Sequence, residues 1–296
     1  MEDYIVRGIA AEGEVRAFAI HSNSMVEEAR RRHDTSPVMT AALGRLLSAA
    51  SMMGAMLKEE KALITLQIQC DGPAEGLIAT ADSQGNVKGF ATSPKVEGTL
   101  KAPGKLDVGA AIGNGSLRVT KDIGLKDPYV GQCDLVTGEI GDDLAYYFTM
   151  SEQTPSAVGL GVLVDTDWTV KQAGGFILQL MPGATAEVIS ALENNLGKIK
   201  SVTALMEEGL TPEEILEKLL GNLDLEILDR IPVEFKCDCS KERVSRALAA
   251  ISHKDLEEMI ESGETIKVKC DFCNTDYEFT TGELSEIRDS RQSDGR

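Results

Sequence analysis

The alternation of apolar and polar positions predicts that the first part of the chain is rich in strands. In one run, Ile64, Leu66 and Ile68 share one face while the residues between them are polar, which is the pattern of a half-buried strand. Ser36 and the proline after it begin a different pattern, a long helix that is apolar on nearly all sides and should therefore be buried. We expect a β-rich domain over residues 1–180, packed around this helix.

Turn-forming residues separate the elements expected in this domain. Strands are expected at residues 4–10, 15–20, 63–70, 77–81, 87–91, 117–120, 129–136, 158–164 and 169–180, and helices at 25–32, 36–58 and 142–151. The glycine-rich stretch 109–115 lacks the Gly-Lys-Ser/Thr ending of a phosphate-binding loop, so we expect a turn-rich connection there. Met52, Met53 and Met56 would suit a flexible binding surface, but filling gaps in a core is the commoner role of methionine.

The middle of the chain changes to a helical pattern. Thr211, Pro212 and Glu214 form a strong helix start, with a capping residue, proline at the first helical position and a capping-box glutamate. Leucine and isoleucine recur beside acidic residues from 216 to 228, and such an amphipathic stretch must cover an apolar surface. We expect residues 181–231 to form a helical linker.

The last part of the chain predicts a small separate domain over residues 232–296. Two helices with serine caps are expected at 240–250 and 252–263, followed by a hairpin over 266–279. The polar residues 288–296 are expected to be disordered. The fold class is therefore α+β: a β-rich domain around a buried helix, a helical linker and a small C-terminal domain.

Four of the six cysteines gather in this last domain, as Cys237-x-Cys239 and Cys270-x-x-Cys273. Two close pairs of soft thiolates brought together by a fold make a tetrahedral zinc site. The spacing differs from that of the common zinc ribbon, and two alternatives remain. One is a pair of structural disulfides, which requires an oxidising compartment; the other is four unrelated buried thiols.

Energetics suggest that the zinc would decide whether this domain folds. A segment of about 60 residues has a marginal core, whereas structural zinc contributes roughly 10–16 kcal/mol to folding in small metallo-domains. Disulfides within each pair would close tiny loops and constrain the unfolded chain by only about 2 kcal/mol. Oxidation of the thiols should therefore eject zinc and unfold the domain.

Composition narrows the classes of partner. The 296 residues carry 48 acidic and 30 basic side chains, a net charge of −18, which disfavours nucleic acid and anionic membrane surfaces as partners. No apolar run approaches the length of a membrane span, and the first residues lack the features of a signal peptide. We therefore expect a cytoplasmic protein, in a compartment where thiols stay reduced.

The chain offers few residues for catalysis, and we expect no enzyme. It has three histidines, His21, His33 and His253, each more typical of a surface or cap position than of a catalyst. Ser151 and the Glu-Gln that follows lack a nearby base and suit a helix end. Cys70, which we expect to be buried, and Cys133, within a strand, lie far upstream of the other four cysteines.

Both cysteine pairs, at the end of an acidic chain of this length, resemble those of the bacterial 33-kilodalton heat-shock proteins, a family of redox-regulated holdase chaperones. Two further stretches resemble the same family, YYFTMSEQTPS at 146–156 and GGFILQLMPG at 174–183. The resemblance covers essentially the whole chain, and the cysteine pattern shows no departure from the family.

The resemblance implies an ATP-independent holdase that captures unfolding proteins under oxidative stress and is a homodimer when active. It implies one zinc ion held by Cys237, Cys239, Cys270 and Cys273 when reduced, and disulfides Cys237–Cys239 and Cys270–Cys273 when oxidised. Two alternatives come from other classes. A thiol–disulfide oxidoreductase using Cys270-x-x-Cys273 would need a βαβ context that the sequence lacks, and a zinc-ribbon protein-interaction module is harder to exclude.

Overall fold

The computed structural model describes residues 2–98, 100–102 and 105–294, which form two compact units, Met1–Lys236 and Cys237–Arg296. The expected α+β class is confirmed, since helices and antiparallel sheets both contribute to the fold. The finer boundaries, with a linker at 181–231 and a domain from 232, stay predictions. Within the described ranges, no helix combines the length and apolar character needed to cross a membrane.

One sheet of the first unit has five antiparallel strands, in the order β10-β11-β2-β1-β12. Its strands are β1 (Tyr4–Ala10), β2 (Val15–His21), β10 (Ser156–Val164), β11 (Val170–Leu180) and β12 (Glu226–Pro232). The short 3-10 turn η1 (Ala11–Gly13) joins the first two strands. The edges of this sheet are therefore β10 on one side and β12 on the other.

The second sheet of this unit has six strands, in the order β13-β5-β4-β3-β8-β9. Its strands are β3 (Leu63–Cys70), β4 (Gly76–Asp82), β5 (Asn86–Ala91), β8 (Gly115–Asp122), β9 (Tyr129–Asp134) and β13 (Glu234–Phe235). Only the pairing of β13 with β5 is parallel. The connection between β5 and β8 holds a small ladder of β6 (Leu100–Ala102) and β7 (Lys105–Leu106), and the short helix α3 (Val108–Ile112).

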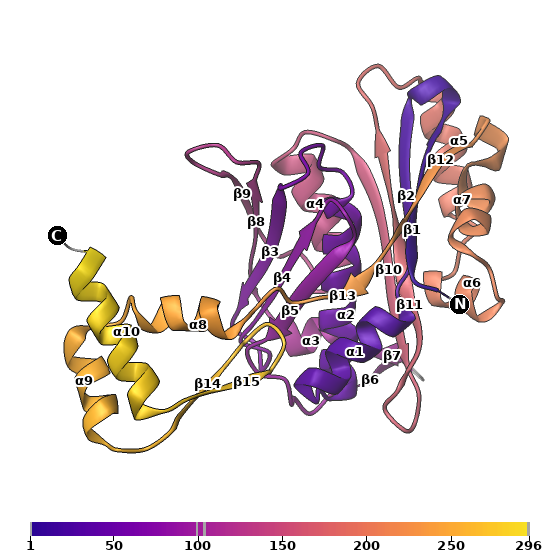
Figure 1. Ribbon diagram of the computed structural model, residues 1–296. Coiled ribbons are helices and arrows are strands. Elements are labelled where there is room, and N and C mark those ends of the chain that lie inside the picture. The colour runs from indigo at the N-terminus through magenta and orange to yellow at the C-terminus, as the bar shows by residue number, and fades with distance from the viewer. Residues whose placement is uncertain (1, 99, 103–104, 295–296) are drawn as a thin grey trace. The chain divides into compact units, whose positions relative to one another are not determined.

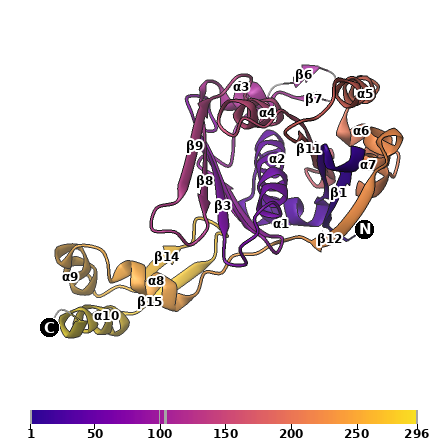
Figure 2. The same cartoon turned by 90° about the horizontal axis from the view of Figure 1, so that it is seen from above.

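Helix α2 (Pro37–Gly54) lies between the two sheets, as the two views in Figures 1 and 2 show. Every residue from Val38 to Gly54 is buried, which confirms the expectation from its apolar composition. The helix ends four residues before the expected Lys58. Glycine allows this close packing, because a Cβ on Gly54 would stand 2.3 Å from the carbonyl oxygen of Asp82.

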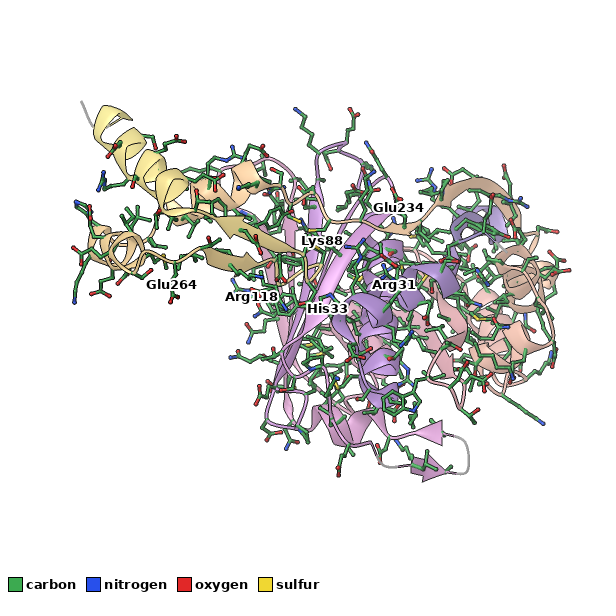
Figure 3. The ribbon with its side chains drawn as sticks, turned by 60° about the horizontal axis from the view of Figure 1, so that its bottom comes forward. Arg31, His33, Lys88, Arg118, Glu234 and Glu264 are labelled. Carbon is green, nitrogen blue, oxygen red and sulfur yellow. The ribbon has the colours of Figure 1, made fainter. Side chains whose placement is uncertain are left out.

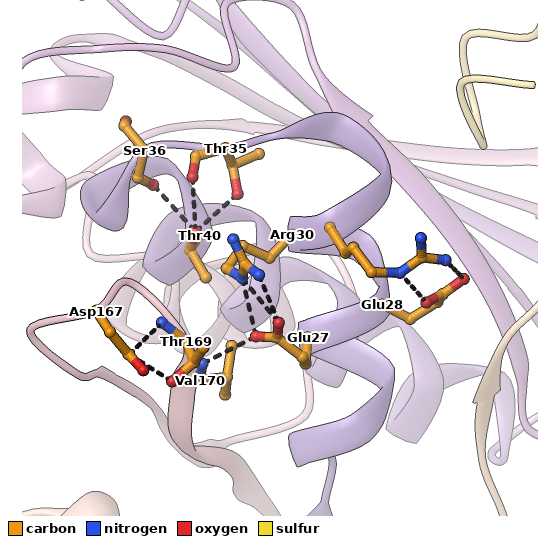
Figure 4. A network of polar contacts seen from close by, with 10 residues as sticks. Glu27, Glu28, Arg30, Thr35, Ser36, Thr40, Asp167, Thr169 and Val170 are labelled. Atoms are coloured by element: carbon orange, nitrogen blue, oxygen red, sulfur yellow. Dashed lines mark hydrogen bonds and ion pairs between the residues drawn. The ribbon is translucent and has the colours of Figure 1, made fainter.

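Polar contacts fix helix α1 (Asn23–His33) beside α2 (Figure 4). The Glu27 carboxylate accepts from Arg30 Nη2 at 2.6 Å and from the backbone N–H of Val170 at 2.9 Å, which ties the helix to β11. The hydrogen bond from Arg30 holds the pKa of Glu27 below its usual range. At the start of α2, the Thr40 hydroxyl donates to the carbonyl oxygen of Ser36 at 3.0 Å.

Three further helices cover one face of the five-stranded sheet: α5 (Ala186–Leu196), α6 (Val202–Glu207) and α7 (Pro212–Leu220). Their buried apolar side chains form one cluster with those of β1, β2 and β11. The predicted capping box of α7 is confirmed, because Thr211 Oγ1 accepts from the Glu214 N–H at 3.3 Å while the Glu214 carboxylate accepts from the Thr211 N–H at 2.8 Å.

The final part of the predicted helical linker is wrong, because residues 226–232 form β12. After the 3-10 turn η2 (Gly221–Leu223), Asp224 takes a left-handed conformation with φ of 53°, which ends the helical path. The chain then pairs with β1 and closes the edge of the sheet. Arg7 Nε donates to Asp229 Oδ1 at 3.1 Å across this pairing.

Strand β13 continues the same segment onto the six-stranded sheet, beside the end of α1. The Glu234 N–H donates to the Gly85 carbonyl at 3.1 Å, and the Lys236 N–H donates to the Val87 carbonyl at 2.8 Å. Figure 3 labels His33 of α1 and Glu234 in this region. One stretch of about ten residues therefore lies along an edge of both sheets.

The second unit contains α8 (Lys241–Leu248), α9 (His253–Glu261), the hairpin β14 (Ile266–Lys269) and β15 (Asp276–Phe279), and α10 (Thr281–Asp294). Its buried core is small and consists of Leu248, Leu256, Phe279 and Leu284. The predicted disorder of 288–296 is wrong as far as Asp294, since α10 extends that far; residues 295–296 lie outside the described part. Arg288 Nη1 pairs with Glu257 of α9 at 3.2 Å, which holds α10 on its neighbour.

Candidate metal centre

The four cysteines of the second unit meet at one point. All four Sγ atoms lie within 4.8 Å of one another. Cys237 and Cys270 are 3.8 Å apart at their sulfurs, and Cys239 and Cys273 are 3.3 Å apart. Four sulfurs about 2.3 Å from a tetrahedral zinc ion would stand roughly 3.8 Å from one another. The spacing and the soft, four-thiol donor set therefore fit zinc.

Two local structures position the four thiols. The first pair lies in the irregular segment before α8, whose first turn is capped by Ser240, with Oγ accepting from the Arg243 N–H at 3.3 Å. The second pair lies in the turn of the β14–β15 hairpin. There the Cys270 carbonyl accepts from the Asn274 N–H at 2.7 Å, and the Cys270 N–H donates to the Thr275 carbonyl at 2.9 Å. The hairpin therefore holds Cys270 and Cys273 on one tight turn.

Hydrogen bonds from the same hairpin reach the sulfurs. The Tyr277 hydroxyl donates to Cys239 Sγ at 3.0 Å, and Cys273 Sγ is hydrogen-bonded to Thr275 Oγ1 at 3.2 Å. Burial opposes ionisation of Cys273, but the bonds from Thr275 and the neighbouring thiols outweigh it and lower its pKa to about 7. Burial raises the pKa of Cys237 and of Cys270.

The four thiols of the centre differ in their exposure to solvent. Cys273 is buried, with 3% of its surface exposed, whereas Cys237, Cys239 and Cys270 are half-buried. Thiolates are both the ligands of soft metals and the form that oxidants attack. The same side chains can therefore hold a metal and meet a small oxidant from solvent.

The other residues singled out from the sequence lie elsewhere. Cys70 and Cys133 are half-buried in β3 and β9, and burial raises the pKa of both thiols, that of Cys133 to about 11. His21 is buried, with Nδ1 3.1 Å from Asp3 Oδ1. Among the described residues, the four-cysteine group is the one cluster of His, Cys, Asp or Glu with a metal-binding arrangement.

The remaining histidines and the segment at Ser151 make packing and polar contacts that stabilise the fold. The His33 ring packs edge-on against Phe235, with centroids 6.2 Å apart, and His253 lies 3.8 Å from Glu257. Next to Ser151, Glu152 accepts from the Tyr147 hydroxyl at 3.0 Å, which fits the expected helix-end role. The sulfur partners Tyr277 and Thr275 were missed from the sequence, where their only signal is their place in the same hairpin as the second pair.

Comparison with known proteins places the chain in a family. The family model described as Hsp33 protein matches residues 3–280. The chain belongs to the Hsp33 family. Among Hsp33 proteins, the 33 kDa chaperonin of Agathobacter rectalis is 62% identical over 97% of this chain and 100% of that protein. The 33 kDa chaperonin of Lachnoclostridium phytofermentans is 56% identical over 97% of this chain and 98% of that protein.

A solved Hsp33 structure has the same fold. The crystal structure of the 33 kDa chaperonin of Thermotoga maritima matches with a TM-score of 0.91 and 39% sequence identity, and the match covers 99% of this chain and 100% of that one. The resemblance found in the cysteine pairs and in the two longer stretches is therefore confirmed at the level of the family.

Proposed function

We propose that the protein is a chaperone of the holdase type, which binds unfolding proteins without ATP and is switched on by oxidation of its four clustered thiols. The names of its relatives support a chaperone. The observation that carries the redox switch is the four-thiol centre in a unit whose described residues bury an apolar cluster of only four side chains. A unit with so little core depends on a cross-link for its fold.

In the reduced protein, Cys237, Cys239, Cys270 and Cys273 would hold one zinc ion. The ion supplies a structural cross-link worth roughly 10–16 kcal/mol in small metallo-domains. The Tyr277 hydroxyl then fixes the orientation of Cys239 through its hydrogen bond to Sγ.

In the oxidised protein, Cys237 would be joined to Cys239 and Cys270 to Cys273. For each pair, two thiols and one hydrogen peroxide give one disulfide and two waters, so both disulfides consume two peroxide molecules. All four sulfurs lie close enough for several pairings. The two cysteines of each proposed disulfide are only two or three residues apart in the sequence. They therefore stay close to each other even after the second unit begins to unfold. Sulfurs in disulfides are no longer thiolates and no longer hold the ion.

Unfolding of the second unit would act on the first through the chain itself. Cys237 directly follows Lys236, the last residue that bonds to β5. Loss of order at Cys237 therefore frees one end of β13. Release of the segment and of the helices before it would expose the apolar cluster that α5, α6 and α7 now cover.

Under this proposal the partners are aggregation-prone client proteins and, in the active state, a second copy of the chain. The acidic balance argues against nucleic acid as a partner. The protein would be cytoplasmic and would catalyse no reaction.

The test measures zinc release and light scattering by an aggregating client together, on protein that is reduced or treated with peroxide at mild heat. Zinc loss with newly gained suppression of aggregation is expected, and Cys270→Ser should abolish its dependence on peroxide. Zinc loss without suppression would contradict the holdase. Reduction of insulin disulfides that depends on one cysteine would favour an oxidoreductase instead.

A further inference from the structure

Two side-chain hydroxyls of the β14–β15 hairpin reach the thiol centre. Thr275 directly precedes β15 and Tyr277 lies within it, and at this spacing the side chains of an extended chain share one face. The Tyr277 hydroxyl donates to Cys239 Sγ at 3.0 Å, and Thr275 Oγ1 lies 3.2 Å from Cys273 Sγ. Each cysteine pair therefore has one member in contact with a hydroxyl of this hairpin.

The two contacts differ in the parts of the chain that they join. Thr275 is two residues from Cys273, so their contact stays within one turn. Cys239 lies 38 residues before Tyr277, in the irregular segment before α8. The Tyr277 hydrogen bond therefore links the two stretches of chain that supply the two cysteine pairs, and it exists only while both stretches are in place.

The packing of the second unit holds the ring of Tyr277. The side chain is half-buried and packs against the small apolar core of this unit. It also stands opposite Val268 in the pairing of β14 with β15. A packed ring leaves its hydroxyl little freedom, so little side-chain entropy is lost when the bond to Cys239 forms. The core of the second unit thus fixes the position of a hydrogen-bond donor at the thiol centre.

A hydrogen bond to a thiolate restrains the reaction of that thiolate with an oxidant. In the first step of oxidation by hydrogen peroxide, the sulfur attacks one oxygen, the S–O bond forms, the O–O bond breaks and hydroxide leaves. The negative charge moves off the sulfur in this step, so a hydrogen bond that depends on that charge weakens toward the transition state. An interaction that is stronger before the reaction than in the transition state slows the reaction.

The second step completes the disulfide without any further oxidant. The neighbouring thiolate attacks the sulfur of the sulfenic acid, the S–S bond forms and a second hydroxide leaves. Each hydroxide takes up one proton and becomes water. Because a hydrogen bond to a charged group is strong and about half of it is lost in the transition state, its removal corresponds to roughly a three- to tenfold change in rate.

We propose that Tyr277 is a positioning residue of the thiol centre, whose hydroxyl holds Cys239 in place and slows the oxidation of its sulfur. This inference rests on the proposed redox switch and adds to it the residue that sets how much peroxide the centre withstands. Tyr277 acts through the sulfur of Cys239 and not through the general stability of the second unit.

The test uses Tyr277→Phe, which removes the hydroxyl and keeps the ring. The reduced, zinc-loaded full-length protein is treated with hydrogen peroxide, quenched by alkylation and digested with trypsin, which separates the two cysteine pairs into residues 237–241 and 270–288. Fragmentation in the mass spectrometer then gives the remaining thiol at each cysteine. Cys239 is expected to be oxidised roughly three- to tenfold faster in Tyr277→Phe than in the parent.

Two further variants show whether the effect belongs to this hydroxyl. Thr275→Val removes the other hydroxyl with little change of shape, and it should speed the oxidation of Cys273 rather than that of Cys239. Tyr129→Phe removes the hydroxyl of a tyrosine that is 60% exposed in the first unit, and it should change neither rate.

Cobalt bound in place of zinc reports on the hydrogen bond without any oxidation. Charge transfer from thiolate to cobalt absorbs in the near ultraviolet, and hydrogen bonds to the sulfurs tune its energy. Without the Tyr277 hydroxyl the sulfur gives up an electron more easily, so this band should move to longer wavelength while the visible bands of tetrahedral cobalt stay unchanged. A merely structural role would weaken cobalt binding without moving the band.

Three results would overturn the inference. Equal oxidation rates of Cys239 in the parent and in Tyr277→Phe would refute it and leave the switch standing. Zinc loss to a chelator in the absence of peroxide that is faster in Tyr277→Phe by the same factor would show that the hydroxyl only stabilises the fold. Resistance of both cysteine pairs of the parent to peroxide would refute the proposed switch, and the inference with it.

Discussion

Phe235 of β13 is the side chain through which the segment before the thiol centre is docked. It is 8% exposed, packs against the ring of His33 and lies under the guanidinium of Arg32, which is 5.8 Å from the ring centroid. Three backbone bonds, to Asp3, Gly85 and Val87, also hold the segment 233–236. We predict that Phe235→Ala releases β13 while the rest of the first unit stays folded.

The magnitudes show why one side chain decides this equilibrium. Replacing a buried phenylalanine by alanine costs about 3–5 kcal/mol, whereas the three backbone bonds contribute about 0.5–1.5 kcal/mol each. Ordering the backbone of four residues, 233–236, costs about 1–2 kcal/mol for each residue. With the Phe235 ring present, the gains from the ring and the backbone bonds slightly exceed the cost of ordering the four residues, and β13 stays docked. Without it, the cost of ordering exceeds the gain from the backbone bonds.

Hydrogen exchange followed by mass spectrometry would measure the release. The amides of Glu234 and Lys236 should lose their protection in Phe235→Ala and exchange roughly 5–10-fold faster than in the parent, because docking in the parent is favoured by only about 1 kcal/mol. Tyr129→Ala is the matched control, since this aromatic residue lies 60% exposed on β9, the other edge of the same sheet, and should leave 233–236 unchanged. Unaltered exchange of Glu234 and Lys236 in Phe235→Ala would refute the argument.

Three further predictions concern the centre and the first unit. Cys270→Ser should make residues 237–296 sensitive to trypsin in the reduced protein, with the thermal transition of the first unit unchanged; resistance equal to the parent would contradict a metal-dependent fold. Cys133→Ser should leave the peroxide response unchanged, because a pKa of about 11 leaves almost no thiolate at neutral pH, and a lost response would contradict this. Glu139→Gln should cost about 3–5 kcal/mol in urea unfolding at pH 7, because it removes the negative charge that neutralises the buried Arg45 guanidinium 2.9 Å away. Burial opposes ionisation of Glu139, but Lys101 and Arg45 outweigh it and lower its pKa, so this stabilisation is present above the unfolded pKa of about 4.3 and the difference from the parent should shrink as the pH falls below it.

Elements with a strong local pattern could be predicted from the sequence. The strand at residues 63–70 has the expected bounds, because its alternation is written in consecutive residues. The buried helix and the cap at Thr211 follow from equally local signals. The thiol centre could be predicted for a chemical reason, since paired cysteines in a chain with few others have few uses.

Pairings between distant segments could not be predicted in this way. Residues 226–232 carry leucine and isoleucine that suit a helix, and their strand conformation depends on the free edge of β1, more than 200 residues earlier. The two-residue pairing of β13 with β5 is too short to leave a pattern. The polar residues from 288 resemble a disordered tail, yet an ion pair between Arg288 and Glu257 helps to hold them as a helix against α9.

The order in which parts of the protein would unfold follows from how much apolar surface each part buries. The apolar cluster of the second unit has four buried members among the described residues, so under the proposed switch this unit should unfold once the thiols no longer bind zinc. The helices α5, α6 and α7 contribute nine buried side chains to the cluster on the five-stranded sheet, worth very roughly 1.5–3 kcal/mol each. The free energy that holds these helices on the sheet is therefore far larger than the free energy that holds β13. Oxidation at ambient temperature should therefore free β13 and leave the helices in place, and mild heating should be needed before the apolar surface beneath them is exposed to a client. Full suppression of aggregation by oxidised protein without heating would contradict this order.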